Sequence, residues 1–227
     1  CLVAYHAVKK SNLLNVALTV IAGIFLLLLG TRGAALIYII CVFICYIISG
    51  STRKTIIKVC VIFGPLIVFL ASPLYLILVK YLYNLAERVG LSVRIFDRLL
   101  NGAFLSSSGR DVIRDKLFVV IRENPLWGNG ICSDRVIVGG YAHNIVIELL
   151  VEYGVFVGFA IFIAIVVVLL RGYFAATDER EKGIIISLIC ASFLKLFLSG
   201  SYLEEGLLFL LLGLCIGSIR IRKHIDY

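Results

Sequence analysis

The sequence predicts a polytopic, all-α membrane protein. Of its 227 residues, 61% are hydrophobic and 16% are charged, whereas soluble domains average about 45–50% apolar and about 25% charged residues. Several apolar runs also reach the roughly 18–20 residues that a helix needs to cross about 30 Å of hydrocarbon. The core of a soluble protein could not bury this much apolar surface. For a membrane protein of this kind we expect no nucleic-acid partner.

Six apolar segments are candidate transmembrane helices, and one long polar stretch separates the third from the fourth. They lie at about 13–30, 33–48, 56–79, 145–170, 184–198 and 203–219. We therefore expect three transmembrane helices in residues 1–79 and a loop with an amphipathic helix in residues 80–143. Residues 144–227 should hold three more transmembrane helices and a basic tail. The chain begins at Cys1 and contains no Met, so we expect it to be part of a longer protein.

The basic residues of the short loops predict which side of the membrane each loop faces. Four clusters fall on one side, which is then cytoplasmic: Lys9 and Lys10; Arg53, Lys54 and Lys58; Arg171, Arg180 and Lys182; and Arg220, Arg222 and Lys223. Both ends of the chain should then be cytoplasmic and the 80–143 loop extracytoplasmic. That loop is itself basic, but segments beyond about 60 residues translocate largely regardless of charge. Its positive charge points to an anionic substrate.

Within the loop, residues 112–123 carry apolar positions at helical spacing. A serine of the preceding Ser106-Ser107-Ser108 run suits the helix N-cap, and Asp111 suits the positive end of the helix dipole. Asn124-Pro125 should end the helix, and the glycine-rich residues 126–130 are typical of a turn. An amphipathic helix that merely lies on the membrane surface fits this pattern equally well.

A histidine and two glutamates stand where the loop meets the fourth apolar segment. His143 is well placed for proton transfer because its unperturbed pKa is near 6.5. Asn144, Glu148 and Glu152 share one helical stripe, and carboxylates at this depth should face protein or water. Structural interpretations compete: His143 bonded to a carbonyl, and the glutamates paired with an arginine.

Two further charges adjoin apolar segments on the outer side. Lys195 lies in the fifth segment, where we expect it to snorkel or to pair with Glu204 or Glu205. Arg32 lies in a tight turn between the first two segments. It serves either as an interfacial anchor or, with Arg110 and His143 on the same side of the membrane, as part of a site.

Taken in order, these motifs resemble those of the O-antigen polymerase and ligase family. The matching residues are Thr31-Arg32-Gly33, Ser108-Gly109-Arg110, the run from Glu123 to Gly130, Ala142-His143-Asn144, and Leu149, Glu152, Tyr153-Gly154 and Gly158. Two departures are Thr31, where the family more often has serine, and the lack of a tryptophan shortly after Gly109-Arg110. The resemblance runs from about residue 13 to the C-terminus and implies the C-terminal half of a fold similar to the GT-C glycosyltransferases.

The resemblance also implies a substrate, a glycan on undecaprenyl pyrophosphate, and a reaction at the outer face of the bacterial cytoplasmic membrane. His143 is then the expected general base. The expected substrate-binding residues are Arg32, Arg110, Arg114, Asn144 and Glu148. The loop offers no evident acidic cluster, so we expect no metal and no cofactor. Membrane lipid is an expected partner, with a chain-length regulator and a flippase as further candidates.

Four functions remain open at this point. A polymerase would join one lipid-linked repeat unit of an O-antigen or capsule to another, and we favour it. A ligase would instead move the polymer to lipid A core or to protein. A transporter or flippase would bind substrate near the midplane, often between related repeats, but the sequence shows no repeat. A noncatalytic membrane anchor would make Arg32 and His143 replaceable.

Overall fold

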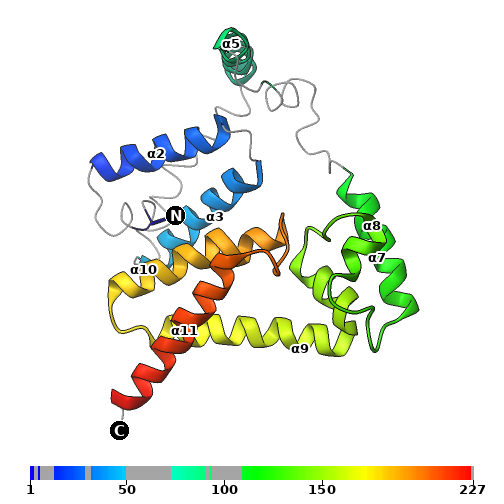
Figure 1. The fold of residues 1–227 in the computed structure, drawn as a ribbon. Coiled ribbons are helices and arrows are strands. Elements are labelled where there is room, and N and C mark those ends of the chain that lie inside the picture. The colour runs from blue at the N-terminus through cyan, green and yellow to red at the C-terminus, as the bar shows by residue number, and fades with distance from the viewer. Residues whose placement is uncertain are drawn as a thin grey trace. The chain divides into compact units, whose positions relative to one another are not determined.

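The computed structural model of the protein is helical in the part of the chain that it describes, so the predicted all-α class is confirmed. The chain divides into two compact units, residues 3–106 and residues 107–227 with 1–2, which are considered separately (Figure 1). The described residues are 1–2, 5, 13–28, 32–49, 73–89, 93 and 109–225.

In the first unit, two helices coincide with the first two predicted apolar segments. Helix α2 spans Leu13–Leu28 and helix α3 spans Arg32–Ser49, and the two are in contact. The hydroxyl of Tyr38 donates to the carbonyl oxygen of Thr19 at 3.1 Å. The buried positions of α3 recur at helical spacing, so one face of this helix is packed: Ile37, Tyr38, Cys41, Val42 and Cys45.

Helix α5 spans Pro73–Val89 and crosses the predicted boundary between the third transmembrane helix and the loop. The helix therefore continues about ten residues past the predicted end of the third apolar segment. Val79 and Ala86, seven residues apart, are both buried, so the same face continues past the boundary. Most of the predicted 56–79 segment lies outside the described residues.

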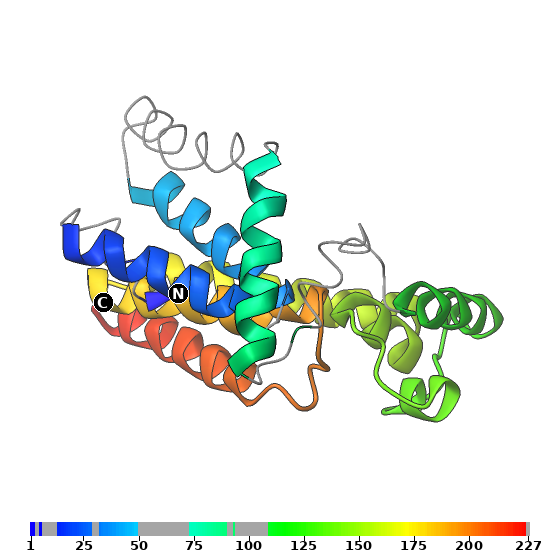
Figure 2. The ribbon, with the colours of Figure 1, turned by 90° about the horizontal axis from the view of Figure 1, so that it is seen from above.

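The second unit combines helices of the predicted loop with those of the last three apolar segments. Figure 2 shows α7 and α8 at the N-terminal end of α9, away from the C-terminal end of α11. Helices α9, α10 and α11 pack against one another. The elements are α7 (Arg110–Glu123), α8 (Ser133–Val138), α9 (Ile145–Ala175), α10 (Glu179–Leu188), a π-helix (Ile189–Leu194), a 3₁₀ turn (Lys195–Phe197) and α11 (Gly206–Ile225).

Two buried clusters hold this unit together. The larger joins α9, α10, the π-helix and α11 around residues such as Leu149, Ile185 and Leu211. The smaller joins α7 to the start of α9 through Leu117, Ile121, Ala142, Ile147 and Val151. One face of helix α7 is thus packed against the start of α9.

Helix α7 begins earlier than expected and without the predicted serine cap. Its N-cap residue is Gly109, which has a left-handed backbone (φ 83°) and makes no side-chain cap hydrogen bond. The serine-cap prediction is therefore wrong, and Ser106-Ser107-Ser108 lies outside the described residues. Asp111 does lie in the first turn, and Asn124 ends the helix as predicted.

Helix α9 is not the continuous helix that the apolar run suggested, because it turns a corner at Gly154. This residue has φ 77° and ψ 173°, far from helical values. The chain doubles back so closely that a Cβ on Gly158 would lie 2.4 Å from the carbonyl oxygen of Leu149. Only a residue without a Cβ fits these two positions.

Beyond the corner, α9 has the properties of a membrane-crossing helix. Among the described helices, Ile145–Ala175 alone is both long and apolar enough by length and composition. Its far end packs closely on α11, since a Cβ on Gly172 would lie 2.3 Å from the Cβ of Cys215. Small residues permit such close helix contacts in membranes.

Candidate functional site

The loop between α8 and α9 delivers His143 to the start of α9. Asn144 is the N-cap of α9, and its side-chain oxygen accepts from the backbone N–H groups of Val146 at 3.0 Å and Ile147 at 3.3 Å. Its side-chain nitrogen donates to the carbonyl of Phe197 at 3.4 Å. His143 itself has a left-handed backbone, φ 57°, which few residue types adopt readily. Asn144 therefore positions His143 through the backbone.

The environment of the His143 ring favours the neutral imidazole. Burial, and then the positive charge of Arg110, lower the pKa of His143 from its ordinary value of 6.5. Nδ1 is buried and has no hydrogen-bond partner among the described residues, so the competing interpretation of a carbonyl-bonded histidine finds no support at this atom. The ring lies 4.3 Å from that of Tyr141, centroid to centroid.

Arg110 reaches the same end of the unit from the first residue of α7. Its Nη1 donates to the carbonyl of Leu198 at 2.5 Å. Asn144 binds the adjacent carbonyl of Phe197, so both side chains are held against the end of the 3₁₀ turn. No ion pair joins Arg110 to a carboxylate among the described residues. Its exposed side chain carries a positive charge that acts on His143.

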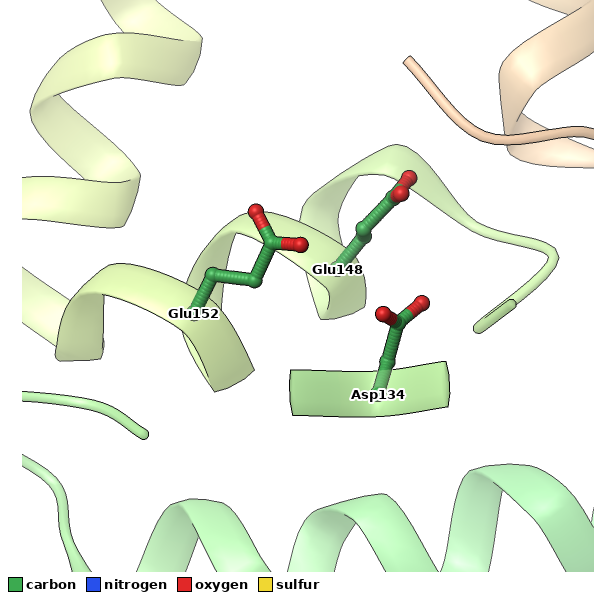
Figure 3. A group of neighbouring side chains, drawn as sticks. All are labelled: Asp134, Glu148 and Glu152. Carbon is green, nitrogen blue, oxygen red and sulfur yellow. The ribbon is translucent and has the colours of Figure 1, made fainter. Parts of the chain in front are cut away.

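Beside this loop, three buried carboxylates converge (Figure 3). Single oxygens of Asp134 on α8 and of Glu148 and Glu152 on α9 lie within 4.8 Å of one another. The prediction that the glutamates face protein is confirmed, because both are fully buried. The sequence showed no acidic cluster within the loop itself, and this cluster combines Asp134 of the loop with two residues of α9. Folding brings this residue to two glutamates that begin the next helix.

Every oxygen of these carboxylates accepts a hydrogen bond. Glu148 accepts from the Ser201 hydroxyl and from the Tyr202 N–H at 3.1 Å. Glu152 accepts from the Cys132 N–H at 2.7 Å and from the Tyr202 hydroxyl at 2.5 Å. Burial, followed by the bond to Glu152, raises the pKa of Tyr202, so its hydroxyl stays a donor.

Arg135 supplies the positive charge of this network. Its Nη1 lies 3.3 Å from Asp134 and 3.8 Å from Glu148, and its Nη2 donates to Ser201 at 2.9 Å and to Glu204 at 3.0 Å. The bond to Glu204 is the largest contribution to a raised pKa of Arg135. A cation bound here would have to displace these donors, so the arrangement fits a structural network better than a metal site.

Asp134 connects this network to His143. Its Oδ2 accepts from the N–H of Ala142, the residue before His143, at 2.9 Å, and its Oδ1 accepts from the N–H of Arg135. Two anchors therefore flank the left-handed residue: Asp134 on one side and the Asn144 cap on the other. The sequence offered no sign of the first anchor, because Asp134 has no regular spacing to the residues that it contacts.

We expect Asp134→Asn to lower the free energy of unfolding by about 1–3 kcal/mol, because the amide cannot accept hydrogen bonds from both the Arg135 and the Ala142 side. Misplacement of His143 should also slow glycan transfer more than it weakens donor binding. Thermal unfolding and single-turnover assays measure the two effects. Asp115→Asn, an exposed aspartate of α7, is the matched control. Indistinguishable behaviour of the two variants would contradict the anchoring role.

The glycine-rich turn after α7 completes the corner of α9. In an unbroken helix the N–H of Val155 would donate to the carbonyl of Val151. Instead, Val155 donates to the carbonyl of Pro125 at 2.7 Å, and Val151 accepts from the N–H of Asn129 at 2.8 Å. Gly130 donates to the carbonyl of Glu152 at 2.9 Å. The turn thus satisfies backbone groups that the corner releases.

The remaining predicted site residues are placed as follows. Arg114 is exposed and forms an ion pair with Asp111 at 2.9 Å. Lys195 pairs with Glu205, as one of its two structural interpretations predicted. Arg32 is the first residue of α3 in the other unit, and its side chain lies outside the described part of the chain. The structure therefore brings together Arg110, His143 and Asn144.

Comparison with known proteins identifies the family. The model of the family described as O-antigen ligase matches residues 17–163, which include both α3 and the loop with Arg110 and His143. No curated protein matches the chain significantly, and no solved structure does so. Because the match covers more than half of the chain, the protein belongs to the O-antigen ligase family, membrane enzymes of the ligase and polymerase type that transfer lipid-linked glycans.

Proposed function

We propose that this protein polymerises undecaprenyl-pyrophosphate-linked repeat units of an O-antigen or capsule at the outer face of the bacterial cytoplasmic membrane. The observation that carries the proposal is the proximity of Arg110, which no described carboxylate neutralises, to a His143 ring whose pKa is lowered. A lipid-linked glycan offers a diphosphate for the first and an acceptor hydroxyl for the second.

The reaction divides between these two side chains. The acceptor hydroxyl attacks the anomeric carbon of the donor sugar and loses its proton to neutral His143. The bond between that carbon and the diphosphate oxygen breaks, and the electron pair leaves on the diphosphate. Arg110 stabilises the developing negative charge, for which a planar guanidinium is well suited because it binds phosphate in a bidentate manner and stays protonated.

Other residues support these roles. By its resemblance to the family, Arg32 of the other unit is also assigned to diphosphate binding. Arg114, which pairs with Asp111, lies one turn along α7 from Arg110. Asn144 holds the backbone at His143 through the N-cap of α9. Glu148 supports the site indirectly and does not contact the substrate, because its oxygens already accept hydrogen bonds from Ser201 and Tyr202. Guanidinium groups take the place of a metal, so we propose a reaction that needs no divalent cation.

The proposed setting is a GT-C-like bundle of six transmembrane helices in this part of the protein, with both chain ends cytoplasmic. Residues 1–79 and 144–227 each contribute three helices, and the 80–143 segment, which contains α7 and α8, lies outside the membrane on its outer face. A lipid-linked donor reaches this face from the outer leaflet. A flippase would supply it, and a chain-length regulator is a further proposed partner.

Ligation is the second candidate function, and the description of the matching family favours it. The two reactions share the donor and the roles of Arg110 and His143. They differ in the acceptor, which is another lipid-linked repeat unit in a polymerase and lipid A core or a protein in a ligase. Acceptor preference therefore separates the two functions.

The test supplies the full-length protein in proteoliposomes with a defined undecaprenyl-pyrophosphate oligosaccharide and both kinds of acceptor. We expect longer lipid-linked glycan as the product, unchanged when EDTA is added. Arg110→Ala should reduce the yield strongly and Arg110→Lys less, because lysine keeps the charge but loses the planar fork. Lys116→Ala, an exposed cation on the same helix, is the matched control.

Three outcomes would contradict parts of this proposal. Transfer to lipid A core or protein alone would assign the ligase function. Abolition by EDTA with restoration by Mg²⁺ would overturn the metal-independent reaction. If Arg110→Ala, in a protein that inserts normally, made as much product as Lys116→Ala, then Arg110 would not bind the diphosphate.

A further inference from the structure

The turn after α7 displays apolar side chains at the surface, next to exposed apolar residues of α7 and α8 such as Val119 and Val136. Trp127 is 87% exposed, Leu126 is 54% exposed and Ile131 is 62% exposed. An isolated exposed apolar residue is ordinary, but three within six positions of one turn, including a tryptophan, concentrate exposed apolar area there. We call these three residues the 126–131 patch.

The backbone that carries the patch is held rigidly. The carbonyl of Pro125 and the N–H groups of Asn129 and Gly130 bond to the corner of α9 on either side of Gly154. A Cβ on Gly128 would lie 2.4 Å from the backbone nitrogen of Gly154, so the two segments touch without side chains between them. The patch therefore has a defined position relative to α9.

The patch lies at the corner of α9, where the long apolar part of this helix begins. Directly after Val155, which binds the turn, Phe156 is 71% exposed and Phe159 is 54% exposed. From Val155 to Ala175, at about 1.5 Å per residue, the helix matches the roughly 30 Å of a bilayer's hydrocarbon core. In a membrane protein these exposed phenylalanines face lipid, and the 126–131 patch continues their surface at its outer end.

We propose that the 126–131 patch contacts the bilayer at its outer interface, with Trp127 at the level of the lipid headgroups. Tryptophan is enriched at this level because its ring is apolar and its N–H is a donor. The bonded corner then fixes the depth of the outer end of α9 and, through the buried contacts between α7 and α9, that of the loop with His143. This inference rests on the proposed topology, which puts this end of α9 on the outer side, and not on the proposed reaction.

Tryptophan fluorescence tests the proposal, because Trp127 is the single tryptophan of these 227 residues. The full-length protein is reconstituted with lipids brominated close to the glycerol or deep in the acyl chain. Subtracting the emission of Trp127→Phe isolates the signal of Trp127. We expect a blue-shifted emission that shallow bromines quench more than deep bromines do, with little quenching by aqueous iodide.

A depth marker makes the comparison internal to the protein. Phe156→Trp in the Trp127→Phe background places the fluorophore on the first turn after the corner, and deep bromines should quench it relatively more than they quench Trp127. Strong iodide quenching of Trp127 without bromine quenching would place the patch in water and overturn the proposal. Quenching by neither would show that protein covers the patch, which overturns it equally.

Discussion

Replacing His143 with asparagine in the full-length protein should slow glycan transfer about 10²- to 10⁴-fold, the usual cost of losing a general base. Asparagine is the informative substitution because His143 has a left-handed backbone, φ 57°, which asparagine tolerates better than most residues do. The loss should therefore reflect chemistry and not misfolding. Donor binding, measured with radiolabelled lipid-linked oligosaccharide, should remain close to that of the wild type.

The pH dependence of the wild type distinguishes two roles for His143. A general base must be neutral, so the rate should fall as pH drops through the pKa of His143. Burial and Arg110 lower that pKa, so the acidic limb should lie below pH 6.5. A protonated His143 that neutralised diphosphate would give the opposite limb, with activity lost as pH rises. The lowered pKa favours the base, because an imidazolium beside Arg110 is disfavoured.

A profile from pH 4.5 to pH 8 on purified protein, compared with His143→Asn, decides the matter. Loss of the acidic limb in the variant, together with the low rate, is the expected result. A wild-type profile without an acidic limb, or a variant that keeps most of the activity, would rule out the general-base role.

Much of the helical framework was predictable, because it depends on local apolar spacing. The predicted segments at 13–30 and 33–48 match α2 and α3 within about two residues. The stripe of Glu148 and Glu152 was likewise predicted to face protein, since helical periodicity relates residues four apart. The proximity of Arg110 and His143 came instead from the resemblance to a family, because no local spacing links residues so far apart in sequence.

The network around Asp134 was not predictable, for the same physical reason. Ser201 and Tyr202 contact carboxylates about 50 positions earlier in the chain. Their hydroxyls look like ordinary turn residues in the sequence, and only the packing of α9 against the residues before α11 brings them to Glu148 and Glu152. Buried polar networks depend on tertiary structure in this way, and hydrophobic periodicity carries no information about them.

The corner of α9 was missed for a different reason. Residues 145–170 are almost uniformly apolar, so composition predicts one continuous helix and a single glycine does not interrupt the pattern. The helix is interrupted by the turn at 124–130. The backbone of this turn forms hydrogen bonds with the groups of α9 that lose their helical partners around Gly154. The glycines at 128 and 154 are needed together, because a Cβ on Gly128 would lie 2.4 Å from the nitrogen of Gly154, and a Cβ on Gly154 would lie 2.3 Å from the carbonyl oxygen of Leu126.

Gly154→Ala should therefore be among the most damaging single substitutions in this unit. Gly154 has φ 77° and ψ 173°, a backbone conformation that is essentially restricted to glycine and costs other residues about 1–3 kcal/mol. The new Cβ would also lie 2.3 Å from the carbonyl oxygen of Leu126, a backbone atom that cannot move without breaking the turn. We expect lost hydrogen bonds at Val151 and Val155, a Tm lower by several degrees and severe loss of transfer.

Gly213→Ala is the matched control, since it adds the same methyl group inside α11 where nothing lies within 4 Å. This variant should be neutral or slightly stabilised, because alanine is favoured over glycine in a helix by roughly 0.5–1 kcal/mol. Thermal unfolding in detergent and transfer assays on both variants measure the difference. The contrary result would be a Gly154→Ala variant that unfolds at the same temperature as Gly213→Ala and keeps its activity. In that case α9 would tolerate a straighter path, and neither the turn nor the site would depend on the corner.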